Sequence, residues 1–143
     1  MDWEESFGKE IERFLTRRQY IFHAPMSEYT TFKIGGEADL LIFPSTPAEV
    51  ATVFRLANKY QIPCTVLGNG SNVLVLDNGI RGVVVKFTDK FFGGIRLEDG
   101  MIFAGAGAKL KDVSNFAAEN SLCGMEFAVG IPGSIGGAVF MNA

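Results

Sequence analysis

The stretch from residue 40 to residue 67 restricts the fold more than any other part of this 143-residue sequence. Residues 40–43 form a short apolar run of the length expected for a buried strand. A helix start follows at Thr46-Pro47-Ala48-Glu49, which combines a threonine N-cap, a proline at the first helical position and the glutamate of a capping box. Pro63 prevents the helix from continuing, and residues 65–67 form a second short strand. The pattern predicts a β-α-β unit with two parallel strands.

The flanking sequence predicts one helix before this unit and a second lobe after it. Residues 3–17 place apolar side chains at helical spacing, which indicates an amphipathic helix. Short strands are predicted at residues 73–76, 83–87, 95–97 and 101–104. Asp99-Gly100 is typical of a type I′ hairpin turn, which needs positive φ at both positions. A helix over residues 110–120 and a glycine-rich bend over residues 130–143 complete the pattern.

Three parts are therefore expected. Residues 1–24 form a helix and a lead-in, residues 25–70 the first β-α-β lobe, and residues 71–143 a second lobe that begins with β-structure. The boundary between the two lobes is expected at the glycines near residues 68–70, where the strand–helix–strand pattern ends.

Composition excludes several classes of function. The net charge is −3 and no segment concentrates basic residues, so a nucleic-acid partner is not expected. No signal peptide or membrane-spanning stretch is visible, which predicts a cytoplasmic protein without a membrane partner. Cys64 and Cys123 lie in apolar surroundings without metal-ligand spacing, so both are expected to be buried thiols.

One candidate ligand site is the glycine turn directly after the second strand of the β-α-β unit. Glycine adopts positive φ and lets a ligand approach the backbone. Consecutive amides in such a turn can converge on an anion. The alternative is an ordinary turn between strands, and spacing does not decide between the two. The candidate residues are Leu67, Gly68, Asn69, Gly70, Ser71 and Asn72.

A second candidate site is the glycine-rich bend near the end of the sequence. If a helix begins near Ser134, its first amides are unpaired and carry the positive end of the helix dipole. The alternative is a tight packing surface made of small residues. The candidate residues are Gly130, Ile131, Pro132, Gly133, Ser134, Gly136 and Gly137.

Familiar catalytic and nucleotide motifs are missing. Neither a Rossmann glycine fingerprint nor a phosphate-binding P-loop is present, and no metal-ligand cluster or catalytic triad can be assembled. His23 is expected in a loop without a partner, in a structural role. Asp77 and Asp89 are expected to be turn residues. Glu126 is the one acid between the two glycine segments that could face a ligand.

An ordered set of motifs resembles the UDP-N-acetylenolpyruvoylglucosamine reductase family, also called UDP-N-acetylmuramate dehydrogenases. The resemblance extends from about Ser27 to the end of the sequence. Its motifs are Tyr29-Thr30-Thr31-Phe32-Lys33-Ile34-Gly35-Gly36, Leu67-Gly68-Asn69-Gly70-Ser71-Asn72, Asp77-Asn78-Gly79, Gly124-Met125-Glu126-Phe127, Gly130 to Gly137 and Met141-Asn142-Ala143. Each motif alone is weak, but the ordered set is specific.

The resemblance implies an α+β fold of the vanillyl-alcohol oxidase/p-cresol methylhydroxylase type, with two lobes that hold FAD without a covalent bond. It nominates the two glycine segments as contacts of the cofactor's diphosphate. It also implies peptidoglycan synthesis, in which NADPH reduces FAD and the flavin reduces UDP-N-acetylglucosamine enolpyruvate to UDP-N-acetylmuramate. FAD carries the electrons, while the protein orients the reactants.

The family's catalytic arginine, serine and glutamate belong to motifs beyond Met141-Asn142-Ala143, so no catalytic residue is assigned. The second lobe is expected to be incomplete, the substrate domain absent and the chain inactive by itself. Exposed apolar surface on such a chain favours self-association. Two alternatives stay open, a non-catalytic flavin- or nucleotide-binding module and another FAD oxidoreductase of the same superfamily.

Overall fold

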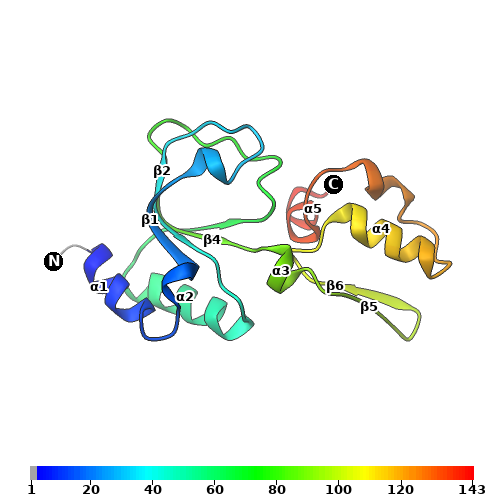
Figure 1. Ribbon diagram of the computed structural model, residues 1–143, viewed down its shortest axis with the longest axis horizontal. Helices are drawn as coiled ribbons and strands as arrows, with labels where there is room; N and C mark the ends of the chain where they lie inside the picture. Colours follow the sequence, from blue (N-terminus) through cyan, green and yellow to red (C-terminus); the bar gives the residue numbers. More distant parts are fainter. Residues whose placement is uncertain (1–2) are drawn as a thin grey trace. The chain divides into compact units, whose positions relative to one another are not determined.

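A computed structural model describes residues 3–143 (Figure 1), and it combines helices with a mixed sheet and a separate hairpin. The chain divides into two compact units. Unit 1 extends to Leu67 and includes Val73–Lys86, while unit 2 consists of Gly68–Asn72 and Phe87–Ala143. The sequence predicted a single boundary near residue 70. The two units have more than one boundary, because the chain returns to unit 1 after residue 72.

Unit 1 contains a four-stranded sheet. Its strands, in spatial order, are β1 (Tyr20–Pro25), β2 (Glu37–Ile42), β4 (Ile80–Lys86) and β3 (Cys64–Leu67). β1 is antiparallel to β2, and β4 runs parallel to both β2 and β3. The two strands of the predicted β-α-β unit therefore share a direction, as expected, but β4 lies between them. An apolar run such as Val83–Val85, which is fully buried, suits a central strand covered on both faces.

Two helices of unit 1 lie next to each other in Figure 1, α1 (Trp3–Ile11) and α2 (Pro47–Lys59). Phe7 of α1 makes an edge contact with Tyr60, and Lys59 forms an ion pair with Glu10. α1 is shorter than the predicted helix over residues 3–17. After Ile11 the chain tightens into turns, with the amides of Arg13 and Phe14 bonded to carbonyls three residues earlier, and Thr16 then caps the 3-10 helix η1 (Arg17–Gln19).

The start of α2 follows the predicted capping pattern. The Thr46 hydroxyl accepts a hydrogen bond from the Glu49 amide at 3.2 Å, and Pro47 occupies the first turn. The Glu49 carboxylate in turn accepts hydrogen bonds from the Ser45 amide and the Gln19 side chain. Burial opposes ionisation of Glu49, but these hydrogen bonds hold its pKa below the ordinary value. Val53 and Ala57 of α2 are buried in the core, whereas Phe54 is 38% exposed.

Two loops of unit 1 run side by side in Figure 1, one after the 3-10 helix η2 (Met26–Glu28) and one before β4. The strand predicted at residues 73–76 is not formed. Instead, the Gly36 amide donates to the Leu76 carbonyl at 2.9 Å. A Cβ at Gly36 would collide with the Asp77 carbonyl oxygen, so glycine is required for this close approach.

Unit 2 contains the hairpin and the other helices of residues 3–143. Its elements are α3 (Asp89–Phe92), β5 (Ile95–Glu98), β6 (Met101–Ala104), α4 (Leu110–Glu119), the 3-10 helix η3 (Glu126–Gly130) and α5 (Ile135–Met141). The predicted turn is confirmed, since Asp99 and Gly100 have φ values of 51° and 75° between paired β5 and β6. The Ser114 hydroxyl of α4 is buried and donates to the Met125 carbonyl, which ties α4 to the segment that leads into η3.

Other expectations are corrected by the fold. Cys123 is exposed and Cys64 is partly buried, so the prediction of two buried thiols is wrong for Cys123. Burial raises the pKa of the Cys64 thiol.

His23 lies in β1 with a φ of 52°, and its imidazole is 3.4 Å from the Glu4 carboxylate, so it is neither in a loop nor without a partner. Within residues 3–143, no helix is both long and apolar enough to span a lipid bilayer.

Candidate functional site

The first predicted segment forms a tight turn directly after β3. Gly70 is buried and has a φ of 75°, a conformation that glycine adopts readily and other residues rarely adopt. Inside the turn the Asn69 side-chain amide donates to the Ser71 hydroxyl at 2.7 Å. This contact braces the turn through its own side chains.

Four main-chain amides of this turn, those of Asn69–Asn72, have no hydrogen-bond acceptor in the described part of the chain. Among the hydrogen bonds of residues 3–143, none is donated by the backbone N–H groups of Asn69–Asn72. Buried amides in proteins are nearly always paired, so the buried Gly70 is unusual. A ligand with anionic oxygens would satisfy such amides, as the sequence interpretation anticipated.

The second predicted segment is the bend between η3 and α5. Backbone hydrogen bonds attach it to the residues before α4. The Leu110 amide donates to the Gly133 carbonyl at 3.0 Å, and the Ile135 and Gly136 amides donate to the carbonyls of Ala108 and Ala106 at 2.8 Å. The bend is therefore a fixed part of unit 2.

The amides at the start of α5 correct one expectation. They were predicted to be unpaired, but those of Ile135 and Gly136 are bonded to carbonyls, and that of Gly137 donates to the Ser134 hydroxyl at 3.3 Å. In the described chain, only Gly133 and Ser134 of the stretch 133–137 have amides without a hydrogen bond. The amides of this bend that remain for a ligand thus lie just before the helix.

Residues 105–108, to which the sequence analysis gave no role, supply the carbonyls that pair with the amides of Ile135 and Gly136. Residues 105–108 read Gly-Ala-Gly-Ala, and their small side chains let the main chain of α5 come close. A Cβ at Gly136 would lie 3.1 Å from both the Cβ and the carbonyl oxygen of Ala106. In the sequence, the small residues at 105–108 and the glycine pair at 136–137 were the features that could have predicted this close packing.

The structure brings the two glycine segments together within unit 2. A Cβ built on Gly68 would lie 2.5 Å from the Ser134 hydroxyl oxygen, so the turn and the bend touch at this point. Ser134 is only 3% exposed. Its own amide is unpaired in the described chain, which adds a second buried donor to that of Gly70.

The other candidate side chains do not gather at these segments. The Glu126 carboxylate is exposed and accepts a hydrogen bond from the Gly124 amide at 2.8 Å. Backbone hydrogen bonds from its own amide and from Gly124 lower its pKa. Asp77 lies in a turn, as predicted, whereas Asp89 begins α3 and forms an ion pair with Lys109 at 2.8 Å. No group of three or more metal-ligating side chains occurs among residues 3–143.

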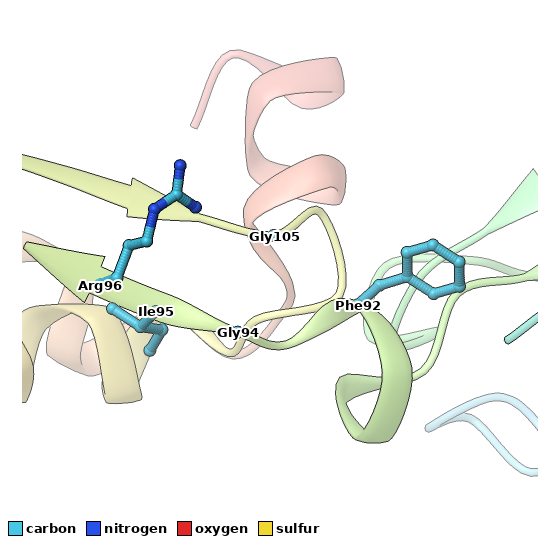
Figure 2. Close-up of a pocket in the computed structure, with 5 residues that line it drawn as sticks. All are labelled: Phe92, Gly94, Ile95, Arg96 and Gly105. Atoms are coloured by element: carbon cyan, nitrogen blue, oxygen red, sulfur yellow. The ribbon is translucent and has the colours of Figure 1, made fainter. Parts of the chain in front are cut away.

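A separate open hollow of about 350 Å³ lies beside the hairpin of unit 2 (Figure 2). It is lined by Phe92, Gly94, Ile95, Arg96 and Gly105. In Figure 2 the Arg96 side chain points away from the strand, and it lies over the ring of Phe103 at 4.5 Å. None of the predicted site residues lines this hollow, so it is distinct from the glycine segments.

The uncharged main-chain N–H groups of these segments suit the binding of linked phosphates. Unpaired amides at residues 69–72 and 133–134 can each donate to an anionic oxygen, and no charged side chain needs to be desolvated. The residues present therefore fit a dinucleotide cofactor's diphosphate.

Comparisons with known proteins identify the family of this chain. The FAD binding domain family matches residues 38–143. A protein of Clostridium perfringens (strain SM101) named UDP-N-acetylenolpyruvoylglucosamine reductase is 48% identical over 137 residues, which are 96% of this chain and 44% of the relative. The chain thus spans less than half the length of that relative.

Solved structures place the fold in the same group. The UDP-N-acetylenolpyruvylglucosamine reductase of Thermus caldophilus matches with a TM-score of 0.64 and 34% identity, over 87% of this chain and 42% of that one. The structure of p-cresol methylhydroxylase is similar in fold, with a TM-score of 0.62 at 15% identity, over 84% of this chain and 25% of that one. The predicted α+β class and fold type are confirmed. The chain belongs to the FAD binding domain family, in a form similar to the UDP-N-acetylenolpyruvoylglucosamine reductases.

Proposed function

We propose that this chain holds FAD without a covalent bond, and that the two glycine segments grip the diphosphate of the cofactor. The observation that carries the proposal is the set of unpaired amides at residues 69–72 and 133–134, on segments that touch at Gly68 and Ser134. The match to the FAD binding domain family supports it, because both segments lie inside the matched range.

Within this proposed site, the chain's own groups would bind the diphosphate and orient the flavin. Glycine at residue 70 permits the positive φ of the turn, and in such turns consecutive amides can converge on an anion. Leu67 is the last residue of β3 and Gly130 the last residue of η3, and Ile131 and Pro132 connect η3 to the unpaired amides at residues 133–134 of the described chain. When bound, FAD supplies hydride transfer, and the protein's task is to place the flavin and exclude competing reactions.

We further propose that the complete protein uses NADPH to reduce UDP-N-acetylglucosamine enolpyruvate in cytoplasmic peptidoglycan synthesis. The names of the relatives from Clostridium perfringens and Thermus caldophilus support this substrate class. No residue of the present chain is assigned a catalytic role. The 143 residues alone are accordingly expected to bind the cofactor but not to reduce the sugar substrate.

Titration of the flavin-free chain with FAD and with FMN tests the proposed site. FMN carries the same ring system but lacks the diphosphate bridge, so its affinity is expected to be at least about tenfold lower, since one or two charge-assisted hydrogen bonds are lost. Quenching of flavin fluorescence measures both dissociation constants. Equal affinity for the two flavins, or no flavin binding, would contradict the proposed role of the amides.

NADPH oxidation by the 143-residue chain tests the second part. We expect no oxidation that depends on the enolpyruvyl UDP-sugar, and we expect such oxidation from the complete protein. Substrate-dependent turnover by the 143 residues would show that they contain catalytic groups. An FAD-loaded complete protein without any turnover would instead favour a non-catalytic flavin module.

A further inference from the structure

Gly68 and Ser134 form the contact through which the two glycine segments meet. The hydroxyl oxygen of Ser134 occupies the space where a side chain at residue 68 would begin, at 2.5 Å from an ideal Cβ. Real Cβ atoms essentially never approach another atom this closely, so residue 68 can only be glycine while Ser134 keeps its hydroxyl in place.

One hydrogen bond holds the Ser134 side chain, and two more hold the backbone on either side of it. Its hydroxyl accepts from the Gly137 amide at 3.3 Å and caps α5. On either side of it, the Gly133 carbonyl accepts from Leu110 and the Ile135 amide donates to Ala108. With 3% of its surface exposed, the residue has little space for another side-chain conformation. The turn at Gly68 thus lies directly against this hydroxyl, and any side chain at residue 68 would have to displace it.

The unpaired amides lie on both sides of this contact. Those of Asn69–Asn72 follow Gly68 directly, and those of Gly133 and Ser134 belong to the bend itself. A change in the separation of Gly68 and Ser134 therefore moves one set of donors relative to the other. Donors that must reach one diphosphate together lose affinity when their spacing changes by a fraction of an ångström.

We propose that Ser134 is a positioning residue, whose buried hydroxyl sets the spacing between the turn 68–72 and the bend 130–134 and thereby sets the affinity for FAD. The hydroxyl acts through its contact with Gly68, and its cap on α5 keeps it there. This inference rests on the proposed function, because it assumes that both segments grip the same cofactor.

The geometry predicts a specific rescue. An alanine at residue 68 would meet the Ser134 hydroxyl at 2.5 Å, but the Ser134 Cβ at 3.7 Å, which is an ordinary van der Waals distance. Gly68→Ala should therefore be harmful when residue 134 is serine and tolerated when it is alanine. Gly94→Ala is the matched control, since a Cβ at Gly94 meets no atom within 4 Å.

The experiment is a double-mutant cycle in the complete protein, with Gly68→Ala, Ser134→Ala and the combined variant. FAD affinity is measured by flavin fluorescence on the flavin-free protein, well below the unfolding temperature. The visible spectrum of bound flavin and the thermal midpoint of the flavin-free protein are recorded beside it. These readouts separate a changed site from a changed folded fraction.

Gly68→Ala is expected to weaken FAD binding by roughly 10-fold or more, because the turn must move away from the bend. Ser134→Ala is expected to weaken it several-fold and to lower the thermal midpoint by roughly 3–6 °C through loss of the cap. The combined variant should bind FAD more tightly than Gly68→Ala alone, and the Gly94→Ala control should bind like the unchanged protein.

Three results would overturn the inference. Gly68→Ala could be equally harmful with serine or alanine at residue 134, which would show that the two positions are not coupled. Ser134→Ala could lower only the thermal midpoint, with FAD affinity and spectrum unchanged, which would leave the serine as a helix cap. If the unchanged protein bound no FAD, the proposed function would fail as well, and this result is distinct from the other two.

Discussion

The two glycine segments look alike in sequence but use their backbones differently. In the turn after β3, the amides of Asn69–Asn72 make no hydrogen bond within residues 3–143. In the second segment, the amides of Ile135, Gly136 and Gly137 at the start of α5 are all paired, and of residues 133–137 only Gly133 and Ser134 have amides without a hydrogen bond in the described chain. One segment presents donors, while the other mainly packs.

The difference shows that a cluster of glycines marks a place of close backbone approach without saying what approaches. At Gly70 the chain turns with positive φ and its amide stays available. At Gly136 the approaching group is another part of the protein, the backbone of Ala106. Substitutions that separate binding from packing therefore test the comparison directly.

The largest effect is expected at Gly70 in the complete protein. Gly70→Val places a β-branched side chain at a φ of 75° and crowds the neighbouring amides, so FAD affinity should fall about 10- to 100-fold. Gly100→Val is a matched control, because Gly100 has the same φ of 75° and a Cβ there meets nothing within 4 Å. Flavin fluorescence titration measures both. A similar loss of affinity in the control would make the effect one of general strain.

A smaller effect, on stability, is expected in the packing segment. Gly136→Ala adds a methyl group 3.1 Å from Ala106 and should lower the free energy of unfolding by about 1–3 kcal/mol. At Gly130 a Cβ meets no atom within 4 Å, so Gly130→Ala should leave that free energy nearly unchanged. Urea denaturation of the flavin-free protein measures the two variants. Equal destabilisation would remove the distinction between packed and open glycines.

Glu49 of unit 1 provides a reference outside both segments. Glu49→Gln should lower the free energy of unfolding at neutral pH by about 1–2 kcal/mol, because hydrogen bonds to the ionised carboxylate are lost. The folded-state pKa of Glu49 is lowered, so its stabilisation is complete above the ordinary carboxyl pKa and disappears as the pH falls through the folded value. Denaturation curves across pH should thus converge in acid, with FAD affinity unchanged at neutral pH. A pH-independent difference would contradict this account.

The smallest effect is expected at the ion pair between Asp89 and Lys109. Both side chains are 52% exposed, and water and salt screen such pairs. Lys109→Ala should change the thermal midpoint by less than the error of the measurement, and FAD affinity should not change. A clear loss of affinity would mean that this lysine supports the bend, whose backbone lies opposite Lys109 at Ser134.

Sequence patterns were reliable where a few neighbouring residues determine the geometry. Asp99-Gly100 forms the predicted hairpin turn, Thr46 caps α2, and Ser134 caps α5 near the predicted start. Sequence patterns failed where residues far apart in the chain determine the local structure. The strand predicted at residues 73–76 is absent, because that stretch pairs through Leu76 with the loop at Gly36. The placement of β4 between β2 and β3 likewise depends on which strands bury their apolar residues.

The sequence alone determined the α+β character of the chain, the family and the two segments in which glycine lets the backbone approach a neighbour, because motifs and turn chemistry are local properties. Only the tertiary structure decided which amides remain unpaired, and it brought Gly68 against Ser134 across more than 60 positions of the chain. A hydrogen bond depends on where two main-chain segments meet, and that follows from packing and not from either segment's composition.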